Sequence, residues 1–510
     1  MLHVVSYPFW ANVQRYKRFV LSSRTITLIN REALDTHTGP AQETRPLSFE
    51  KELPAGDLRP KVALVTLGCK VNFSETEALA DNFQRAGFAL VEPHGEVTPD
   101  VYIVNTCTVT HVADRKSRQM LRRVKRANPQ AVVVATGCYV YTSPGEVSGI
   151  PEVDLVVRKT DEERLVELVS ERLNYELPYR PEPSRLLFAG GLAAPEAHPH
   201  TLDSYRTRAM VKIQDGCNAG CAFCIVPTAR GGPQSVSIRE VVEGVRQKAA
   251  AGFQEVVLTG VHLGKYRAPS PDGALEARPV RLKALLEAVL NEVDLPRLRI
   301  TSLEPQDYDP TLLELWQRDR RLSRHFHLAL QAGSDATLVR MRRGYNLERY
   351  ARIVEQIRRE LPDASITTDV IVGFPGETDQ EAAETLAFAR QMGYAKMHVF
   401  PYSPRAGTSA ATMPNQVPEP IKKERGEKLR LLSDELSRSW RERFVGEVRP
   451  VLWESSENTA DSMVWSGLTD NYIRVYASSE EPLHNRVTPT RLVRLAGQGD
   501  AEGMWGEVTE

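Results

Sequence analysis

The sequence predicts an α/β protein with three folded parts: a doubly wound parallel sheet, a partial (β/α)6 TIM-like barrel and a small antiparallel β-barrel. The 510 residues are enough for about three domains of ordinary size. Buried-strand patterns alternate with helical patterns over most of the chain, which is typical of parallel sheets. After Phe444 the pattern changes to short β-type runs broken by Gly, Asn and Pro, which indicates a small barrel.

The first alternation, in residues 59–176, predicts the N-terminal doubly wound sheet. Apolar runs at 62–66, 101–104 and 131–135 are its predicted strands. The run Ser74-Glu75-Thr76-Glu77 fits a capping box, so a helix is predicted to begin there. A basic helix is predicted between the second and third strands. The preceding residues, 1–58, are an extension of unknown role.

The second alternation, in residues 207–440, predicts the partial barrel. A linker rich in Pro, Gly, Ala and His precedes it at 177–206. The predicted strands start near Ala209, Glu255, Leu298, His325, Ile366 and Lys396. A long charged helix follows from Ile421 to about Phe444. Residues 441–510 form the predicted antiparallel barrel, with strands at 448–453, 472–476 and 490–495.

Composition and charge exclude several classes of protein. The chain has 65 Lys+Arg and 66 Asp+Glu, so no overall field marks it as a nucleic-acid or membrane binder. No apolar run reaches the roughly 18 residues of a membrane span, and residues 1–58 lack a secretory signal. Six cysteines in this length argue against a secreted disulfide framework. We therefore predict a cytoplasmic protein without a membrane partner.

The cysteines fall into two sets of three. Cys69, Cys107 and Cys138 each follow one of the strands predicted in residues 59–176. Because ligands bind at the carboxyl ends of parallel strands, these cysteines are expected to meet at one crevice. Three unrelated buried thiols are the alternative.

The second set has the spacing Cys217-x3-Cys221-x2-Cys224, directly after the first predicted barrel strand. Such a loop offers three thiolates. Structural zinc normally takes four ligands, and no fourth cysteine lies nearby. Three ligands on a four-iron cluster would leave one iron open for a small bidentate ligand. On spacing alone, a zinc-stabilised, non-catalytic RNA-binding protein remains the alternative.

With both sets, residues 60–510 resemble the methylthiotransferase family of radical S-adenosylmethionine enzymes. The matching strings are TLGCKVN (66–72), VNTCTVT (104–110), GCY (137–139), IQDGC (213–217), TTDVIVGFPGE (367–377), FPYSPR (400–405) and GLTDNY (467–472). The last string lies in the part that resembles the family's RNA-binding TRAM module.

The resemblance implies two [4Fe-4S] clusters, one on each cysteine set, and S-adenosylmethionine as a further cofactor. The cluster on Cys217, Cys221 and Cys224 would give the electron that cleaves S-adenosylmethionine to a 5′-deoxyadenosyl radical. The cluster on the other set would supply sulfur. A reducing electron donor such as a flavodoxin or ferredoxin is then a partner. The expected cofactor contacts are Thr259, Gly260, Gln331 and Gly373, with a plain strand-to-helix turn as the alternative for the first two.

The strings at 68–72 and 107–110 most resemble the enzymes that methylthiolate C2 of N6-threonylcarbamoyladenosine beside the tRNA anticodon. Prenyl-adenosine in tRNA and an aspartate of a ribosomal protein are the alternative substrates. The distribution of charge supports an RNA substrate in one part of the chain and not in another. Residues 115–126 hold seven Lys+Arg, which suits phosphate contacts, whereas residues 445–510 hold five Lys+Arg against eleven Asp+Glu.

Overall fold

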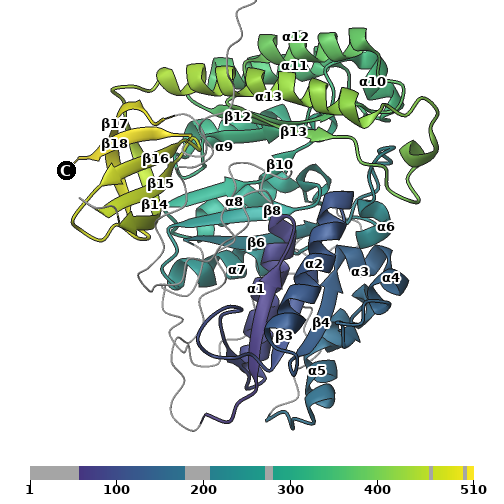
Figure 1. The fold of residues 1–510 in the computed structure, drawn as a ribbon. Coiled ribbons are helices and arrows are strands. Elements are labelled where there is room, and N and C mark those ends of the chain that lie inside the picture. Colours follow the sequence, from purple (N-terminus) through teal and green to yellow (C-terminus); the bar gives the residue numbers. More distant parts are fainter. Residues whose placement is uncertain (1–56, 179–206, 270–279, 459–462, 498–501, 510) are drawn as a thin grey trace, which may run out of the picture. The chain divides into compact units, whose positions relative to one another are not determined.

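The computed structural model describes residues 57–178, 207–269, 280–458, 463–497 and 502–509. The predicted extension (1–58) and linker (177–206) therefore lie almost wholly outside the described residues. The predicted fold class is confirmed by two α/β parts with parallel sheets and a closed β-barrel (Figure 1). Among the helices of the described residues, none has the length and apolarity needed to cross a bilayer.

The N-terminal part is a five-stranded parallel sheet in the order β2-β1-β3-β4-β5. Its strands are β1 (Lys61–Thr66), β2 (Ala89–Leu90), β3 (Val101–Thr106), β4 (Val132–Gly137) and β5 (Leu155–Val156). Its helices are α1 (Lys70–Arg85), α2 (His111–Ala127), α3 (Cys138–Thr142), α4 (Pro144–Ser148), η2 (Lys159–Arg164) and α5 (Leu165–Leu173). One apolar cluster contains Phe83 of α1 and another contains Leu121 of α2, so both faces of the sheet are covered.

Helix α1 begins earlier than predicted. It starts at Lys70, with Cys69 as its N-cap residue, so the prediction of a start at Ser74 is wrong. Ser74 and Glu77, the N-cap and N3 positions of the expected box, lie inside α1, and the carboxylate of Glu75 between them is buried and paired with Arg230. Tertiary contacts thus override the local capping signal.

The central part contains all six predicted strands in a partial barrel. They run in the order β6-β8-β9 and, after a break at Thr301, β10-β11-β12-β13, with β7 antiparallel at one edge. The strands are β6 (Arg208–Asp215), β7 (Gln234–Ser235), β8 (Glu255–Gly260), β9 (Arg297–Ile300), β10 (Ser302–Leu303), β11 (His325–Leu328), β12 (Ser365–Val372) and β13 (Lys396–Pro401).

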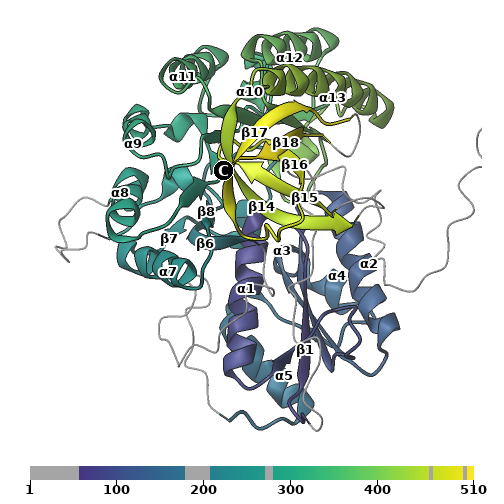
Figure 2. The ribbon, with the colours of Figure 1, turned by 90° about the vertical axis from the view of Figure 1, so that its left-hand side faces the viewer.

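Helices surround the outer face of this sheet (Figure 2). The helices of this part are α6 (Val226–Arg230), α7 (Ile238–Ala250), α8 (Leu282–Glu292), α9 (Leu313–Arg318), α10 (Asp335–Arg340), α11 (Leu347–Glu360), α12 (Asp379–Met392) and α13 (Glu419–Glu442). Short 3-10 turns are η4 (Leu263–Lys265), η5 (Pro305–Asp307), η6 (Pro310–Leu312) and η7 (Ser409–Thr412).

The strands of the barrel alternate between an apolar outer face and a polar inner face. In β12, Ile366 and Val370 join the core beneath the helices, so Thr367 and Asp369 face the inside. The same alternation puts two histidines of β11 and one of β13 on the inner face: His325, His327 and His398. Parallel strands covered on both faces are usually apolar throughout, so this pattern indicates space for a polar ligand.

The C-terminal part is a closed five-stranded barrel in the order β14-β15-β16-β18-β17. The strands are β14 (Val448–Asn458), β15 (Met463–Thr469), β16 (Arg474–Ser478), β17 (Val487–Leu495) and β18 (Met504–Val508). Trp453, Trp465 and Leu492 are in its core. The barrel is antiparallel as predicted except for the parallel pair β16 and β18.

Candidate active site

The structure brings Cys69, Cys107 and Cys138 together at the carboxyl edge of the N-terminal sheet. Cys69 follows β1, Cys107 follows β3, and Cys138 begins α3 directly after β4. Gly68 permits this convergence: at φ 108°, its added Cβ would lie only 2.9 Å from Cys107 Cβ. Gly137 is equally constrained, because a Cβ there would lie 2.2 Å from Oδ1 of Asn105.

Asn72 ties the loops of this N-terminal set together. Its Nδ2 donates hydrogen bonds to the carbonyl oxygens of Leu67 (2.8 Å) and Thr106 (3.0 Å). Its Oδ1 lies 3.7 Å from Cys69 Sγ and 3.9 Å from Cys138 Sγ. One buried amide therefore fixes the ends of two strands and contacts two of the three thiols.

Arg230, the last residue of α6, reaches the N-terminal set from the element that follows the second cysteine set. Its Nη2 donates to Asn72 Oδ1 (2.8 Å), and its Nη1 donates to Glu75 Oε1 (2.7 Å) and Asp215 Oδ1 (3.0 Å). The side chain of Arg230 is only 2% exposed, so it cannot serve as a phosphate contact. Although burial opposes the change, Arg230 and Lys212 hold the pKa of Glu75 down at about 2. The carboxylate therefore stays ionised in the interior.

A second buried arginine, Arg405, joins the barrel to the loop that carries Cys107. Its guanidinium donates to Asp114 Oδ2 and to Thr108 Oγ1, both at 2.6 Å. Burial raises the pKa of Cys107 to about 12 and that of Cys138 to about 11. Burial therefore favours the protonated form of both thiols in the metal-free protein.

Cys217, Cys221 and Cys224 share the loop between β6 and α6. Cys217 Sγ lies 3.3 Å from Nδ1 of His262, whose Nε2 is 2.7 Å from Oδ2 of Asp307. Burial raises the pKa of Cys217, but hydrogen bonds from His262 and a backbone amide outweigh it, so the pKa is lowered. Burial lowers the pKa of His262, yet Asp307 and Cys217 raise it to about 9.

Arg343 contacts this second set directly. Its Nη1 donates to Cys221 Sγ at 3.0 Å, and its Nη2 pairs with Glu304. A pocket of about 340 Å³ opens beside this contact. Its lining residues are Ala219, Cys221, Lys265, Gln306, Asp307, Arg342, Arg343 and Gly344.

The donor sets fit iron–sulfur clusters better than single zinc ions. A tetrahedral zinc with Zn–S bonds of about 2.3 Å holds its sulfurs roughly 3.8 Å apart. Within the described part of the chain, neither cysteine set has three ligand atoms within 4.8 Å of one another. Three thiols at wider separation match the thiolate ligation of a larger cluster.

The four expected cofactor contacts lie at the carboxyl end of the barrel strands. Thr259 is buried on the inner face near the end of β8, with Gly260 after it. Gln331 has φ 67° and is held by backbone hydrogen bonds to β12, and Gly373 has φ 69° directly after that strand. None of the four lines the pocket beside Cys221. Their contact with the cofactor stays a prediction.

Sequence reasoning missed the polar residues around the second cysteine set. His262 follows β8 and Glu304 follows β10, so both lie where barrel enzymes place functional groups. That position was the available signal for these two. Arg343 follows α10 and gave no comparable signal.

The cations of α2 and the aromatic and cationic residues of the C-terminal barrel have different surroundings. On α2, Lys125 pairs with Asp154, whereas Arg115 and Arg123 are exposed. Within the described residues, no carboxylate lies within 4.0 Å of either arginine. In the C-terminal barrel, the ring of Tyr472 stacks on His325 with centroids 4.4 Å apart, Arg474 pairs with Glu454, and Arg494 covers the ring of Trp505.

Two family models match the chain. The Radical SAM superfamily matches residues 211–389, and the uncharacterized protein family UPF0004 matches residues 61–158. The threonylcarbamoyladenosine tRNA methylthiotransferase MtaB of Bacillus subtilis is 38% identical, over 88% of this chain and 97% of that protein. The chain belongs to the radical S-adenosylmethionine methylthiotransferases. It is an enzyme that transfers a methylthio group and uses S-adenosylmethionine and a [4Fe-4S] cluster.

Other relatives carry two different names. The MtaB protein of Aquifex aeolicus is 37% identical, over 81% of this chain and 96% of that protein. A tRNA-2-methylthio-N(6)-dimethylallyladenosine synthase of Moorella thermoacetica is 34% identical, over 84% and 95%. The radical S-adenosylmethionine methyltransferase TsrM of Kitasatospora setae has the same fold, with a TM-score of 0.50, 17% identity and coverage of 69% of this chain and 77% of TsrM. Family membership decides against a non-catalytic zinc protein.

Proposed function

We propose that this methylthiotransferase acts on tRNA, adds a methylthio group to C2 of N6-threonylcarbamoyladenosine, and carries two [4Fe-4S] clusters. One cluster would bind Cys217, Cys221 and Cys224, and the other Cys69, Cys107 and Cys138. The observation that carries the proposal is the presence of two separate convergent cysteine sets connected by the buried Arg230. One set alone would suffice for radical chemistry, and the second supports a separate sulfur source.

When bound, the clusters and S-adenosylmethionine would supply the electron, the radical and the sulfur. The chain's own residues hold the ligands in place. Asn72 and Arg230 fix the loops of the N-terminal set, and the hydrogen bonds of His262 and Arg343 reach the sulfurs of the second set. Cys107, Cys138 and Cys217 are buried and the other three cysteines are partly exposed, which limits the access of water and competing donors to the reacting groups.

The threonylcarbamoyl substrate is supported by the relatives named MtaB, at 38% and 37% identity, and by the strings around Cys69 and Cys107. The dimethylallyl enzymes at 34% identity keep prenyl-adenosine as the second candidate. The exposed Arg115 and Arg123 on α2 support an RNA substrate over a basic ribosomal protein. The proposed partners are tRNA and a reducing donor such as a flavodoxin or ferredoxin, and the proposed location is the cytoplasm.

Mass spectrometry of nucleosides from bulk tRNA, with and without this gene, tests the proposal. We expect the methylthio derivative of threonylcarbamoyladenosine to disappear on deletion and to return with the wild-type gene. Complementation with Cys107→Ala is the matched control and should not restore it. If that nucleoside persists and methylthio-prenyl-adenosine disappears instead, the substrate assignment is wrong.

A further inference from the structure

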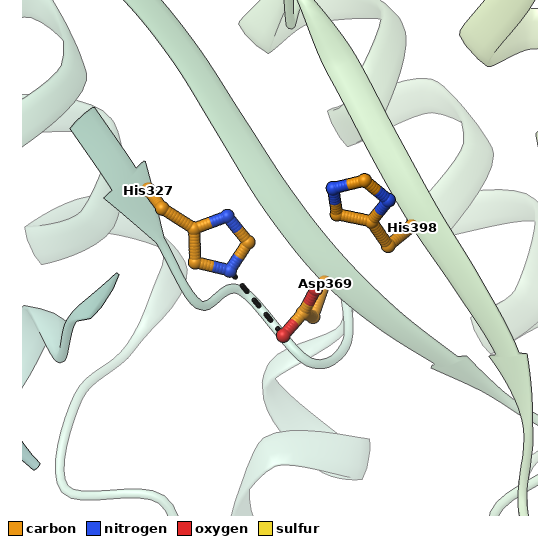
Figure 3. Close-up of side chains that lie close together, drawn as sticks. All are labelled: His327, Asp369 and His398. Carbon is orange, nitrogen blue, oxygen red and sulfur yellow. Dashed lines mark ion pairs between the residues drawn. The ribbon is translucent and has the colours of Figure 1, made fainter. Parts of the chain in front are cut away.

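The inner face of the barrel carries a polar group that the cluster sites do not use. His327 of β11, Asp369 of β12 and His398 of β13 lie close together, with ligand atoms within 4.8 Å of one another (Figure 3). Nε2 of His327 is 3.3 Å from Oδ2 of Asp369, and its Nδ1 is 3.0 Å from Oγ1 of Thr367. Ile371 and Phe400, the next inner-face pair toward the carboxyl ends, are apolar.

Lys70 reaches the same space from the N-terminal part. It is the first residue of α1, directly after Cys69, and α1 packs against β6 and β8 of the barrel. Its charge acts on His325, His398 and Tyr472, so its ammonium group lies near all three. Lys70 is partly exposed and directly follows Cys69. It therefore lies between a proposed cluster ligand and the polar inner face of the barrel.

Lys70 differs from the neighbouring cations because, among the described residues, it has no ion-pair partner. The others are paired: Arg208 with Glu454 (2.7 Å), Arg299 with Glu255 (2.6 Å) and Lys212 with Glu75 (2.9 Å). Within the described residues, no carboxylate oxygen lies within 4.0 Å of Lys70 Nζ. Nη1 of Arg299 is also buried there without a hydrogen-bond partner. An unpaired charge in a largely buried position is costly unless a ligand supplies the partner.

We propose that Lys70 binds the carboxylate of the group on N6 of the substrate adenosine, and that His327, Asp369 and His398 bind its remaining polar atoms. This deepens, and rests on, the proposed function. A threonylcarbamoyl group carries a carboxylate, a hydroxyl and a urea, whereas a prenyl group is hydrocarbon. A prenyl group would leave Lys70 without a negatively charged partner, and sites built to bind a polar group discriminate strongly against substrates that lack it.

The same side chains resemble a two-histidine, one-carboxylate metal site, but the charges around them disfavour a divalent cation. The positive charges of Lys70 and Lys396 lie close enough to His398 to lower its pKa, and Asp369 is the one carboxylate of the group of three. Burial lowers the pKa of His398 to about 4, so the ring is neutral at pH 7 and can donate or accept a hydrogen bond. An organic anion with polar arms fits this environment better.

The test uses reconstituted holoenzyme and three anticodon stem-loop RNAs that differ at one adenosine. That adenosine carries a threonylcarbamoyl group, the same group with its carboxylate replaced by a carboxamide, or a prenyl group. We expect Lys70→Met to lower kcat/KM and weaken Kd for the threonylcarbamoyl RNA by roughly 10- to 100-fold, the size of a lost charge-assisted hydrogen bond. On the carboxamide RNA the wild type should already show the reduced kcat/KM and weaker binding, and Lys70→Met should cause no further loss. Lys70→Arg should restore part of the activity.

The control is Lys283→Met, which removes a lysine paired with Glu314 on the outer helix α8. Iron and sulfide content and the spectra of both clusters must stay unchanged in Lys70→Met, because Lys70 adjoins Cys69. Equal losses on all three RNAs, no loss on the threonylcarbamoyl RNA, or a wild type indifferent to the carboxamide would each overturn the inference while leaving the proposed function intact. The inference would also be overturned if the wild type held an additional equivalent of zinc or iron that His398→Gln lacks. A wild type active on the prenyl RNA alone would remove the proposed function itself, and the inference with it.

Discussion

The two cysteine sets reach similar geometry by opposite routes. Cys217, Cys221 and Cys224 lie within eight residues on one loop, and their polar neighbours come from the same barrel. The N-terminal set is collected from three strand ends, and its buried counter-charges come from another part of the chain. The local set is encoded by spacing, whereas the dispersed set is encoded by topology. The dispersed set should therefore respond more strongly to changes outside its own loops.

The largest expected effect separates the chemistry of the two sets. Cys221→Ala should abolish cleavage of S-adenosylmethionine, because it removes a ligand of the cluster that would reduce it. Cys107→Ala should retain cleavage and lose the methylthiolated product. Chromatography of 5′-deoxyadenosine and mass spectrometry of the RNA measure both. Identical behaviour of the two variants would break the proposed division between the sets.

A second comparison uses the buried arginine at each set. Arg230→Met leaves the buried carboxylates of Glu75 and Asp215 with Lys212 as their shared cation, and we expect a loss of about 3–5 kcal/mol in the free energy of unfolding. Arg343→Met leaves only Glu304, which is 19% exposed, and should cost about 1–3 kcal/mol. Urea unfolding of the metal-free proteins gives both values. Arg318→Met, on an arginine 65% exposed, is the control and should change little. Equal costs at the two sets would contradict the contrast drawn above.

We expect a smaller effect on the reduction potential of the cluster that the second cysteine set would bind. Arg343 donates a hydrogen bond to Cys221 Sγ, and hydrogen bonds to cluster sulfurs raise the reduction potential. Arg343→Met should therefore move the potential of that cluster by roughly 30–60 mV to more negative values. Arg230→Met should leave the potential of that cluster unchanged. Potentiometric titration followed by electron paramagnetic resonance measures the shift, and a move toward positive values would count against the assigned contact.

The smallest effect concerns the RNA surface beside the N-terminal set. Arg115→Ala and Arg123→Ala should each weaken tRNA binding and reduce the slope of log K against log salt by about 1, as expected for the loss of one phosphate contact. Fluorescence titration at several salt concentrations measures this slope. The exposed Arg318 on the outer helix α9 is the matched control, and an identical slope change for Arg318→Ala would remove α2 from the interface.

Patterns that repeat locally were predictable from the sequence. The strand–helix alternation identified both parallel sheets, and the position of each lone cysteine after a strand pointed to their meeting. Contacts between residues far apart in the sequence were not predictable. Ser74 and Glu77 fit a capping box in isolation, but α1 begins at Lys70, and nothing local indicates that Glu75 pairs with Arg230, 155 residues away.

Two strands of the C-terminal barrel, β15 and β18, were not predicted, and for β18 there is a physical reason. β18 is a five-residue strand that pairs with both β16 and β17, and such pairing over long separations leaves little local signal. The polar inner face had a readable signal that was not used. In β11, His325 and His327 alternate with apolar Phe326 and Leu328, a period of two that marks one face as polar.

The ion pair between Glu75 and Arg230 also sets an order of events during synthesis. The N-terminal sheet leaves the ribosome before Lys212 and Arg230 exist, and the 155 residues that separate Glu75 from Arg230 take on the order of ten to thirty seconds to make. During that interval the carboxylate of Glu75 has neither cation beside it. The N-terminal cysteine set thus acquires its complete surroundings only after β6, with Lys212, and α6, with Arg230, have been translated.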